Sequence, residues 1–290
     1  MVSIYGKKKR ISDMMMYALI YISAGFSVFL LIGIVAFVFL NGFDKVNLEF
    51  LTTTSSILRG TVGIAGNILN TIYIIVLTML IVTPIGVGTA IYLNEYAKPG
   101  KFVKLIELAT ETLSGIPSII FGLFGMMFFG EVLNLDYSIL TGTLTLTLMV
   151  LPLVTRNTQE ALKTVPNSYR NGAIGLGTGK WYMIRTILLP SAMPGIITGV
   201  ILAIGRIVGE SAALLYTAGS SDLLPIGVQG YLNKIFESGG TLTIQLYLSA
   251  TKGEYDVAFG VAVVLLLVVL GINFITKLLT KKFDVNNLNK

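Results

Sequence analysis

Histidine and cysteine are both absent from the 290 residues of this chain, and charged residues make up only 12% of it. Without an imidazole or a thiol, the chain has no Ser–His or Cys–His nucleophile system, no disulfide and no thiolate metal site. An enzyme of this composition would have to work with carboxylates, lysine or tyrosine alone. We therefore expect a protein that is not an enzyme, and the absence of cysteine leaves its redox compartment open.

The scarcity of charge accompanies an excess of apolar residues. Hydrophobic residues form 54% of the chain, and 31 glycines come in addition. Soluble domains reach only about 45–50% with glycine included, and about 25% of their residues are charged. Because so much apolar surface does not fit inside one aqueous core, the sequence predicts an integral membrane protein.

Six long runs lack Asp, Glu, Lys and Arg, and a helix of about 20 such residues crosses a hydrocarbon core about 30 Å thick. The predicted spans cover residues 14–43, 60–94, 112–130, 137–155, 186–205 and 257–276. Continuous runs of this length favour helices over the short alternating strands of a membrane β-barrel. We expect an all-α polytopic membrane protein whose six-helix domain, residues 14–280, lies between an N-terminal segment 1–13 and a tail 281–290.

The basic residues are distributed unevenly around these spans. With six spans, the segments between them alternate between the two sides of the membrane. Sixteen of the 21 Lys and Arg residues lie on the same side as the N-terminal run 7–10, Lys-Lys-Lys-Arg. The positive-inside rule assigns that side to the cytoplasm, so both termini and an inner loop 156–190 are expected there, with an extracytoplasmic loop 218–256 opposite. The net charge of +6 is then an orientation signal in a cell membrane, and no nucleic-acid partner is expected.

Several residues inside the spans perturb helices. Gly115, Pro117 and Ser118 interrupt the third predicted span, and a proline frees a carbonyl that a neighbouring helix or a cavity must satisfy. This break is either a packing kink or a gate. Gly195 and Gly199, four residues apart in the fifth span, favour close approach of another helix.

One basic residue lies within a span. Arg206 is about ten residues beyond the inner edge of the fifth span, hence about 15 Å deep, and Glu210 follows on the same helical face. The two side chains could neutralise each other. However, intramembrane charges usually line a substrate path, and a guanidinium suits a tetrahedral oxyanion. We predict that Arg206 contacts a transported anion and that Glu210 orients it.

Three other charged residues near span ends remain open to two interpretations. Arg156, at the inner end of the fourth span, either anchors the helix at the interface or belongs to the same path. Glu107 and Glu111 either form an interfacial helix end or couple a gate or a proton to transport.

The glycine-rich stretch 172–180 is not a phosphate-binding loop. Ile174 occupies the position of its first glycine, and Trp181 follows Lys180 where a Ser or Thr would hold magnesium. The chain therefore has no recognisable nucleotide site, and its energy source is a gradient or a partner.

The same inner loop contains a triplet, a glycine and an Ile-x-Leu-Pro sequence at fixed spacing. The residues concerned are Asn171, Gly172, Ala173, Gly177, Ile187, Leu189 and Pro190. This pattern resembles the EAA signature of ABC-importer permeases, in which the loop docks on a cytoplasmic ATPase. Asn171 and Gly172 replace the Glu and Ala of the signature.

Three further segments are similar to phosphate-specific permeases of the PstA type. They are residues 92–97, 114–125 and 198–212, and the resemblance extends over about 57–277. It implies the type I, MetI-like permease fold of ABC importers and a phosphate route that includes Arg206, Arg156 and Glu210. It also implies a heterodimer with a sister permease of the PstC type, two ATPase subunits that bind ATP and magnesium, and an extracytoplasmic phosphate-binding protein. No cofactor is expected on this chain itself.

The sequence thus predicts a permease subunit of an ATP-driven phosphate importer, working by alternating access across the lipid bilayer. Three alternatives remain open. The chain could transport another oxyanion, such as sulfate or molybdate, it could be a carrier or channel driven by an ion gradient, or it could be an intramembrane enzyme.

Overall fold

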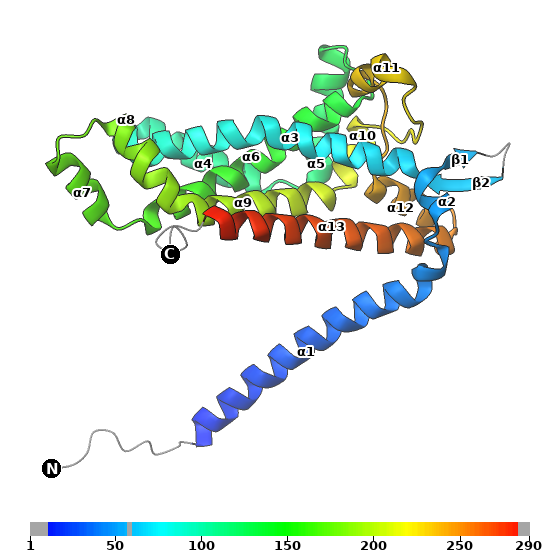
Figure 1. Cartoon of the computed structure of the whole chain (residues 1–290), viewed down its shortest axis with the longest axis horizontal. Helices are drawn as coiled ribbons and strands as arrows, with labels where there is room; N and C mark the ends of the chain where they lie inside the picture. Colours follow the sequence, from blue (N-terminus) through cyan, green and yellow to red (C-terminus); the bar gives the residue numbers. More distant parts are fainter. Residues whose placement is uncertain (1–10, 57–59, 284–290) are drawn as a thin grey trace.

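The computed structural model describes residues 11–56 and 60–283, and most of these residues are helical (Figure 1). The basic run 7–10, Arg59 and the last seven residues of the predicted tail lie outside this part. In chain order the elements are α1 (Ile11–Gly42), η1 (Phe43–Lys45), α2 (Leu48–Thr52), β1 (Thr54–Ser56), β2 (Thr61–Ile64), α3 (Ala65–Ile91), η2 (Tyr92–Tyr96), α4 (Lys101–Gly115), α5 (Ser118–Gly125), η3 (Met126–Val132), α6 (Ile139–Thr164), α7 (Asn167–Gly175), α8 (Lys180–Met183), η4 (Ile184–Leu188), α9 (Leu189–Val208), α10 (Ala212–Thr217), α11 (Gly227–Asn233), η5 (Lys234–Phe236), α12 (Leu242–Thr251) and α13 (Tyr255–Phe283).

The helices long and apolar enough to cross a membrane number five in the described part, or six if one bent pair counts as a single span. The five are Ser12–Lys45, Ala65–Tyr96, Ile139–Thr164, Lys180–Val208 and Tyr255–Leu278. Each contains one of the predicted spans or most of it. The prediction of a helical, multi-span membrane protein is thus confirmed.

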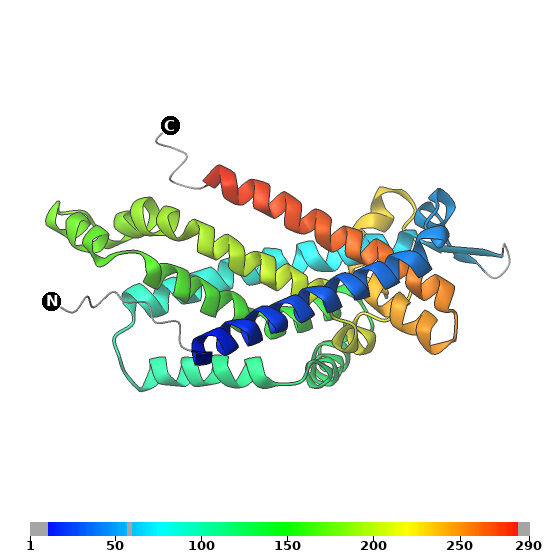
Figure 2. The same ribbon diagram turned by 90° about the horizontal axis from the view of Figure 1, so that it is seen from below.

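The third predicted span is not one straight helix. It is the bent pair, in which Lys101–Gly115 and Ser118–Val132 meet at an angle of 103°. Figure 2 shows α4 running along the bundle and the following helix nearly end-on. Pro117 explains the break, because the residue before a proline is driven out of the helical region, and Ile116 is extended at φ −74° and ψ 132°. The predicted span 112–130 therefore runs across this break, and the pair is the sixth span if its two helices cross the membrane together.

The core of the bundle lies where α6 packs between α3 and α9. Two glycines of α9 allow its close approach to α6. A Cβ added to Gly195 would lie 2.7 Å from Ala161 Cβ, and one added to Gly199 would lie 2.6 Å from Asn157 Cβ. The close helix approach predicted from the spacing of these glycines is confirmed.

Helix α1 leaves the bundle over most of its length (Figure 1). Only its C-terminal end packs on α13, where the rings of Phe37 and Phe259 meet edge to face with centroids 5.6 Å apart. The described side chains before this end are almost all exposed, although they are overwhelmingly apolar. The described part of this chain leaves this surface uncovered.

One end of the bundle is built from short elements (right in Figure 1). Strands β1 and β2 form an antiparallel hairpin in which Thr54 pairs with Ile64. Helix α3 begins only at Ala65, so the start of the predicted span 60–94 is a strand instead of a helix. The predicted loop 218–256 contains α11, η5 and α12. Because the sequence predicts loop 218–256 to be extracytoplasmic, we call this region the outer end.

The opposite end contains α7 and α8 (left in Figure 1), and we call it the inner end. Helix α6 continues to Thr164 and Pro166 precedes α7. The predicted loop 156–190 therefore begins inside a helix, and it is itself largely helical.

Candidate functional site

Two arginines from different helices line one cavity of about 220 Å³. Arg206 comes from the last turn of α9 and Arg156 from α6. The other lining residues are Thr110, Ser114, Met149, Pro152 and Leu153. None of these described lining residues is a carboxylate, so the cavity presents two positive charges to whatever enters it. We call it the arginine cavity.

The polar side chains opposite the arginines come from α4. Thr110 and Ser114 are four residues apart, and their hydroxyls donate to the backbone oxygens of Ile106 and Glu111 at 2.7 Å each. With their protons engaged, these oxygens face the cavity as hydrogen-bond acceptors. The cavity therefore offers hydrogen-bond acceptors in addition to its two positive charges.

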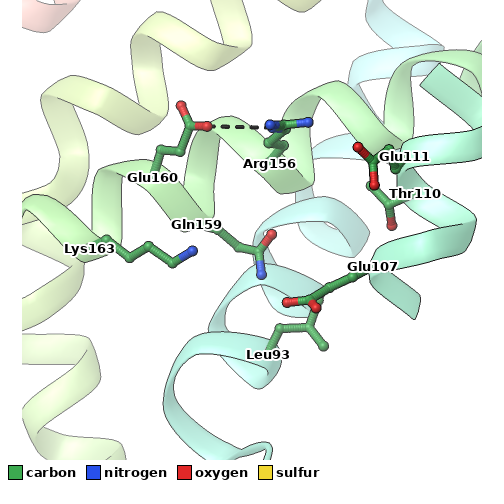
Figure 3. A pocket seen from close by; sticks show the side chains of 8 residues that line it. All are labelled: Leu93, Glu107, Thr110, Glu111, Arg156, Gln159, Glu160 and Lys163. Carbon is green, nitrogen blue, oxygen red and sulfur yellow. Dashed lines mark ion pairs between the residues drawn. The ribbon is translucent and has the colours of Figure 1, made fainter. Parts of the chain in front are cut away.

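Arg156 also lines a second cavity, of about 280 Å³, nearer the inner end. Figure 3 shows Glu107 and Glu111 of α4 across this space from the residues of α6. The complete lining is Leu93, Glu107, Thr110, Glu111, Arg156, Gln159, Glu160 and Lys163. With three carboxylates against two cations, it has the opposite charge balance, and we call it the acidic cavity.

Arg156 is held on the acidic side by Glu160, one helical turn further along α6. Its Nε lies 3.5 Å from Glu160 Oε1, and both side chains are about two-thirds exposed, at 66% and 64%. Exposed ion pairs of this kind contribute only about 0–1 kcal/mol. Arg156 is therefore a cation shared by two cavities and only weakly bound by its partner.

Glu210 does not join this arrangement. Helix α9 ends at Val208, so Glu210 is not on a continuing helical face with Arg206, and no ion pair links the two within residues 11–56 and 60–283. Its buried carboxylate instead accepts a hydrogen bond from Ala213 N at 3.0 Å, at the start of α10. The backbone oxygen of Glu210 accepts from Thr243 Oγ1 at 2.9 Å. The expected shared helical face is thus wrong, and in this structure Glu210 fixes the chain at the end of α9; its role in orienting Arg206 stays a prediction.

The predicted gate residues form the break between α4 and α5. Gly115 ends α4, Pro117 precedes α5 and Ser118 begins it. The arginine cavity is lined by Ser114, directly before the break, and by none of these three residues. Their role as a gate stays a prediction, but the break places the end of α4 beside the cavity.

In the loop that resembles a docking signature, some of the signature residues are exposed and others are buried. Asn171 and Gly172 lie exposed on α7, whereas Ala173 is buried, and its oxygen accepts hydrogen bonds from the backbone nitrogen and the hydroxyl of Thr178. Gly177 has φ +75°, a left-handed conformation that glycine adopts without strain. The loop is thus a folded unit.

The end of the signature leads back into the bundle. Ile187 and Leu189 pack on a buried apolar cluster that includes Ala173 and Leu188, and Pro190 lies in the first turn of α9. Apolar side chains point outward from the loop and were not singled out by the motif. They are Tyr169, Ile174, Leu176, Trp181 and Tyr182, each more than half exposed.

Sequence reasoning also missed Thr110, Ser114 and Glu160. The four-residue spacing of Thr110 to Ser114 and of Arg156 to Glu160 was the available signal, because such residues share a helical face. No cluster of three or more Asp, Glu, His or Cys side chains in the described part is arranged to hold a metal ion.

The sequence of this chain matches a family model. Residues 83–285 match the model of the binding-protein-dependent transport system inner membrane component. The chain is 35% identical over 261 residues to the probable ABC transporter permease protein YqgI of Bacillus subtilis, covering 88% of each chain. It is 30% identical over 273 residues to the phosphate transport system permease protein PstA of Haemophilus influenzae, covering 93% of this chain and 94% of the relative.

Solved structures with the same fold are less similar in sequence. A chain of a bacterial alginate ABC transporter, in complex with an alginate-bound periplasmic protein, aligns with a TM-score of 0.67 at 17% identity, covering 93% of this chain and 96% of the other. A chain of the inward-facing MetNI methionine ABC transporter aligns with a TM-score of 0.57 at 19% identity, covering 78% and 95%. The fold is that of MetI-like importer permeases, as the sequence predicted.

Proposed function

The chain belongs to the family of binding-protein-dependent transport system inner membrane components, and on this premise we propose that it is the permease subunit of an ATP-driven importer of inorganic phosphate. The coarser statement, an ABC-importer permease with the type I fold, follows from the family and the fold. The identity of the substrate as phosphate is the further part of the proposal, and it rests on the arginine cavity.

The charge of the arginine cavity supports an oxyanion. Arg156 and Arg206 present two guanidinium groups to about 220 Å³ without a lining carboxylate, and guanidinium groups bind tetrahedral oxyanions with paired hydrogen bonds. A pair of cations that is not fully enclosed holds an anion only weakly. Weak binding suits a transport path, since an ion that is held tightly does not leave.

Hydrogen-bond acceptors favour phosphate over sulfate. The oxygens of Thr110 and Ser114, and further inward the carboxylates of Glu107 and Glu111, accept hydrogen bonds but have no proton to give in this geometry. Phosphate retains a proton near neutral pH and sulfate does not. The name of the Haemophilus influenzae relative supports the same substrate.

The proposed mechanism is alternating access. A binding protein delivers phosphate from outside, the ion reaches Arg206 and Arg156, and ATP binding by two ATPase subunits moves the loop 156–190 and with it the helices. Arg156 returns to Glu160 as the ion leaves, and once the ion has passed the acidic cavity the carboxylates there oppose its return to the arginines. In this proposal the complex includes a sister permease of the PstC type, and the ATPase subunits bind ATP and magnesium. The chain lies in the cell membrane with both termini in the cytoplasm.

Reconstitution of the complete complex in liposomes, with its binding protein outside and ATP inside, tests the proposal. We expect uptake of radiolabelled phosphate that stops without ATP and is not reduced by excess sulfate or molybdate. Competition by either anion would assign a different oxyanion. Uptake that ignored ATP and collapsed with an uncoupler would instead identify a gradient-driven carrier.

A further inference from the structure

One side chain at the inner end ties three elements together. Arg170 of α7 donates to Glu95 Oε1 through Nε at 3.2 Å and through Nη2 at 2.9 Å. It also donates to the backbone oxygens of Leu162 and Val165, at 2.9 Å each. These two oxygens belong to the end of α6, so one guanidinium joins α7 to α6 and to Glu95.

Glu95 lies in the segment that continues α3. It lies in η2, the π-helical turn that follows α3 directly, and its Oε1 accepts a third hydrogen bond from Asn94 Nδ2 at 2.7 Å. Its side chain is only 6% exposed and that of Arg170 17%. The pair is thus nearly enclosed, unlike Arg156 and Glu160.

A second contact links the same two segments. Lys180, at the start of α8, lies over the ring of Tyr96 with its Nζ 4.9 Å from the centroid. Val87 and Ile91 of α3 pack on the apolar cluster that holds Ala173 and Leu188 of the loop. The inner end of α3 is therefore attached to the loop by charge and by apolar packing.

Helix α7 has few other attachments to the bundle. It packs mainly on α8 and η4, which belong to its own loop, so Arg170 is its principal polar link to α3 and α6. Those two helices in turn shape the cavities, because η2 contributes Leu93 to the acidic cavity and α6 contributes Arg156 to both.

We call the loop 156–190, which is predicted to dock on an ATPase, the docking loop. We propose that Arg170 and Glu95 are the joint that transmits movement of the docking loop to the two cavities. Pulling or tilting α7 displaces the inner ends of α3 and α6 as one body, and Arg156 moves with α6. A planar fork with five donors in fixed geometry transmits such a movement better than a single point charge. Arg170 and Glu95 are positioning residues, and the inference rests on the proposed function only in that the chain transports an oxyanion with ATPase partners.

The first test uses two conservative variants, Arg170→Lys and Glu95→Gln, in the complete reconstituted complex. We expect wild-type amounts of ATPase in the purified complex and an unchanged basal rate of ATP hydrolysis. The number of phosphate ions carried per ATP should fall about tenfold, within the range typical of coupling between two sites. The matched control is Glu237→Gln, which removes the carboxylate of an ion pair with Lys234 at the outer end and should change neither quantity.

Two results would overturn the proposal. If both variants carry as many phosphate ions per ATP as the wild type, the joint transmits nothing. If instead the ATPase no longer copurifies, the residues only maintain the docking surface.

The second test exploits the lack of cysteine in the chain. The double variant Glu95→Cys with Arg170→Cys can be cross-linked by a short thiol reagent without background from this subunit. Before cross-linking we expect the same loss of coupling, and after it a recovery of transport, because the two segments then move together again. A fully cross-linked but inactive complex would show that they have to separate.

Failure of the joint is distinguishable from failure of the proposed substrate. If the wild-type complex carries sulfate or molybdate instead of phosphate, the same ratio is measured with that ion. The joint would then stand, although the phosphate proposal had fallen.

Discussion

The outer and inner ends of the bundle are held together by different kinds of interaction. At the outer end, uncharged side chains of α3 bind the backbone of the segment before α12: Asn67 Nδ2 donates to Gly240 O at 3.0 Å, and Asn70 Nδ2 to Ser221 O at 2.9 Å. The two asparagine side chains are buried. At the inner end the interactions are charged: the nearly enclosed pair of Arg170 and Glu95 joins α7 to α3 and α6, whereas Arg156 and Glu160, two-thirds exposed, form a weak pair beside the two cavities.

This difference separates a fixed end from a movable one. Buried hydrogen bonds to backbone carbonyls are costly to break, since each leaves a polar group unsatisfied. Exposed ion pairs exchange partners at little cost. We therefore expect the outer end to act as the fulcrum and the inner end to open and close, with stability controlled by the first and transport by the second.

The largest expected effect is a loss of protein stability when a hydrogen bond at the outer end is removed. Replacing Asn70 with Ala leaves the oxygens of Ser221 and Gly240 without this donor and should lower the stability of the protein by about 3 kcal/mol. Thermal unfolding of the purified chain in detergent measures it. The control is Thr78→Val, because the buried Thr78 Oγ1 has no partner among the described residues and its loss should be nearly neutral. Equal unfolding temperatures for the two variants would refute the fulcrum.

The next largest effect is at the arginine cavity. Arg206→Ala should reduce phosphate uptake by about 100-fold, since two charge-assisted hydrogen bonds are worth about 3 kcal/mol. Its unfolding temperature should hardly change, because the side chain is exposed on this chain. Arg206→Lys keeps the positive charge but loses the planar guanidinium, so its phosphate uptake should lie between that of the wild type and that of the alanine variant. Wild-type uptake by the alanine variant, at equal protein level, would remove Arg206 from the path.

A smaller effect is expected in the docking loop. Gly177→Ala places a side chain at φ +75° and should destabilise the loop by about 1 kcal/mol. Gly172→Ala is the matched control, since a Cβ there meets no atom within 4 Å and a helical alanine gains about 0.5–1 kcal/mol. Protection of the loop amides in hydrogen exchange should move in opposite directions. Equal protection in both variants would contradict the strained turn.

The smallest effect concerns the exposed pair. Glu160→Gln releases Arg156 from its partner and should tighten phosphate binding to the purified complex by about two- to fivefold, in line with the strength of surface pairs. The gain should shrink as salt is added. Glu254→Gln, an exposed carboxylate near the outer end, serves as the control. Weaker binding by the Glu160 variant would indicate that Glu160 holds the ion site together.

Local chemistry made several features predictable. Composition indicated the membrane, the runs without charge located the spans, and Gly195 and Gly199 indicated where helices approach closely. The loop that resembles the docking signature has a glycine turn and a return to the bundle that depend on neighbours in the chain, whereas its docking on an ATPase stays a prediction. Such features are encoded over a few helical turns, and the structure agrees with them.

Two expectations about the path of the backbone are not met, for identifiable reasons. The span 112–130 was drawn across Pro117 because apolar runs do not reveal direction, and Ile116 turns the chain by adopting an extended conformation. Glu210 was paired with Arg206 on the assumption of a continuous helix, but α9 ends two residues earlier. In both cases the residues were noted correctly, and the path of the backbone between them was not.

The absence of histidine and cysteine, the apolar runs and the scattered basic residues determined by themselves that this is a helical membrane protein with an arginine inside a span and a basic loop at one end of the bundle. Only the tertiary structure decided that Arg156 and Arg206, from two helices, share a cavity, and that Arg170 meets Glu95 across 75 positions of sequence. The physical reason is the distance along the chain over which each kind of interaction acts. Hydrophobicity and turn preferences act between neighbours in the chain, whereas the meeting of charges depends on how whole helices pack and where each of them ends.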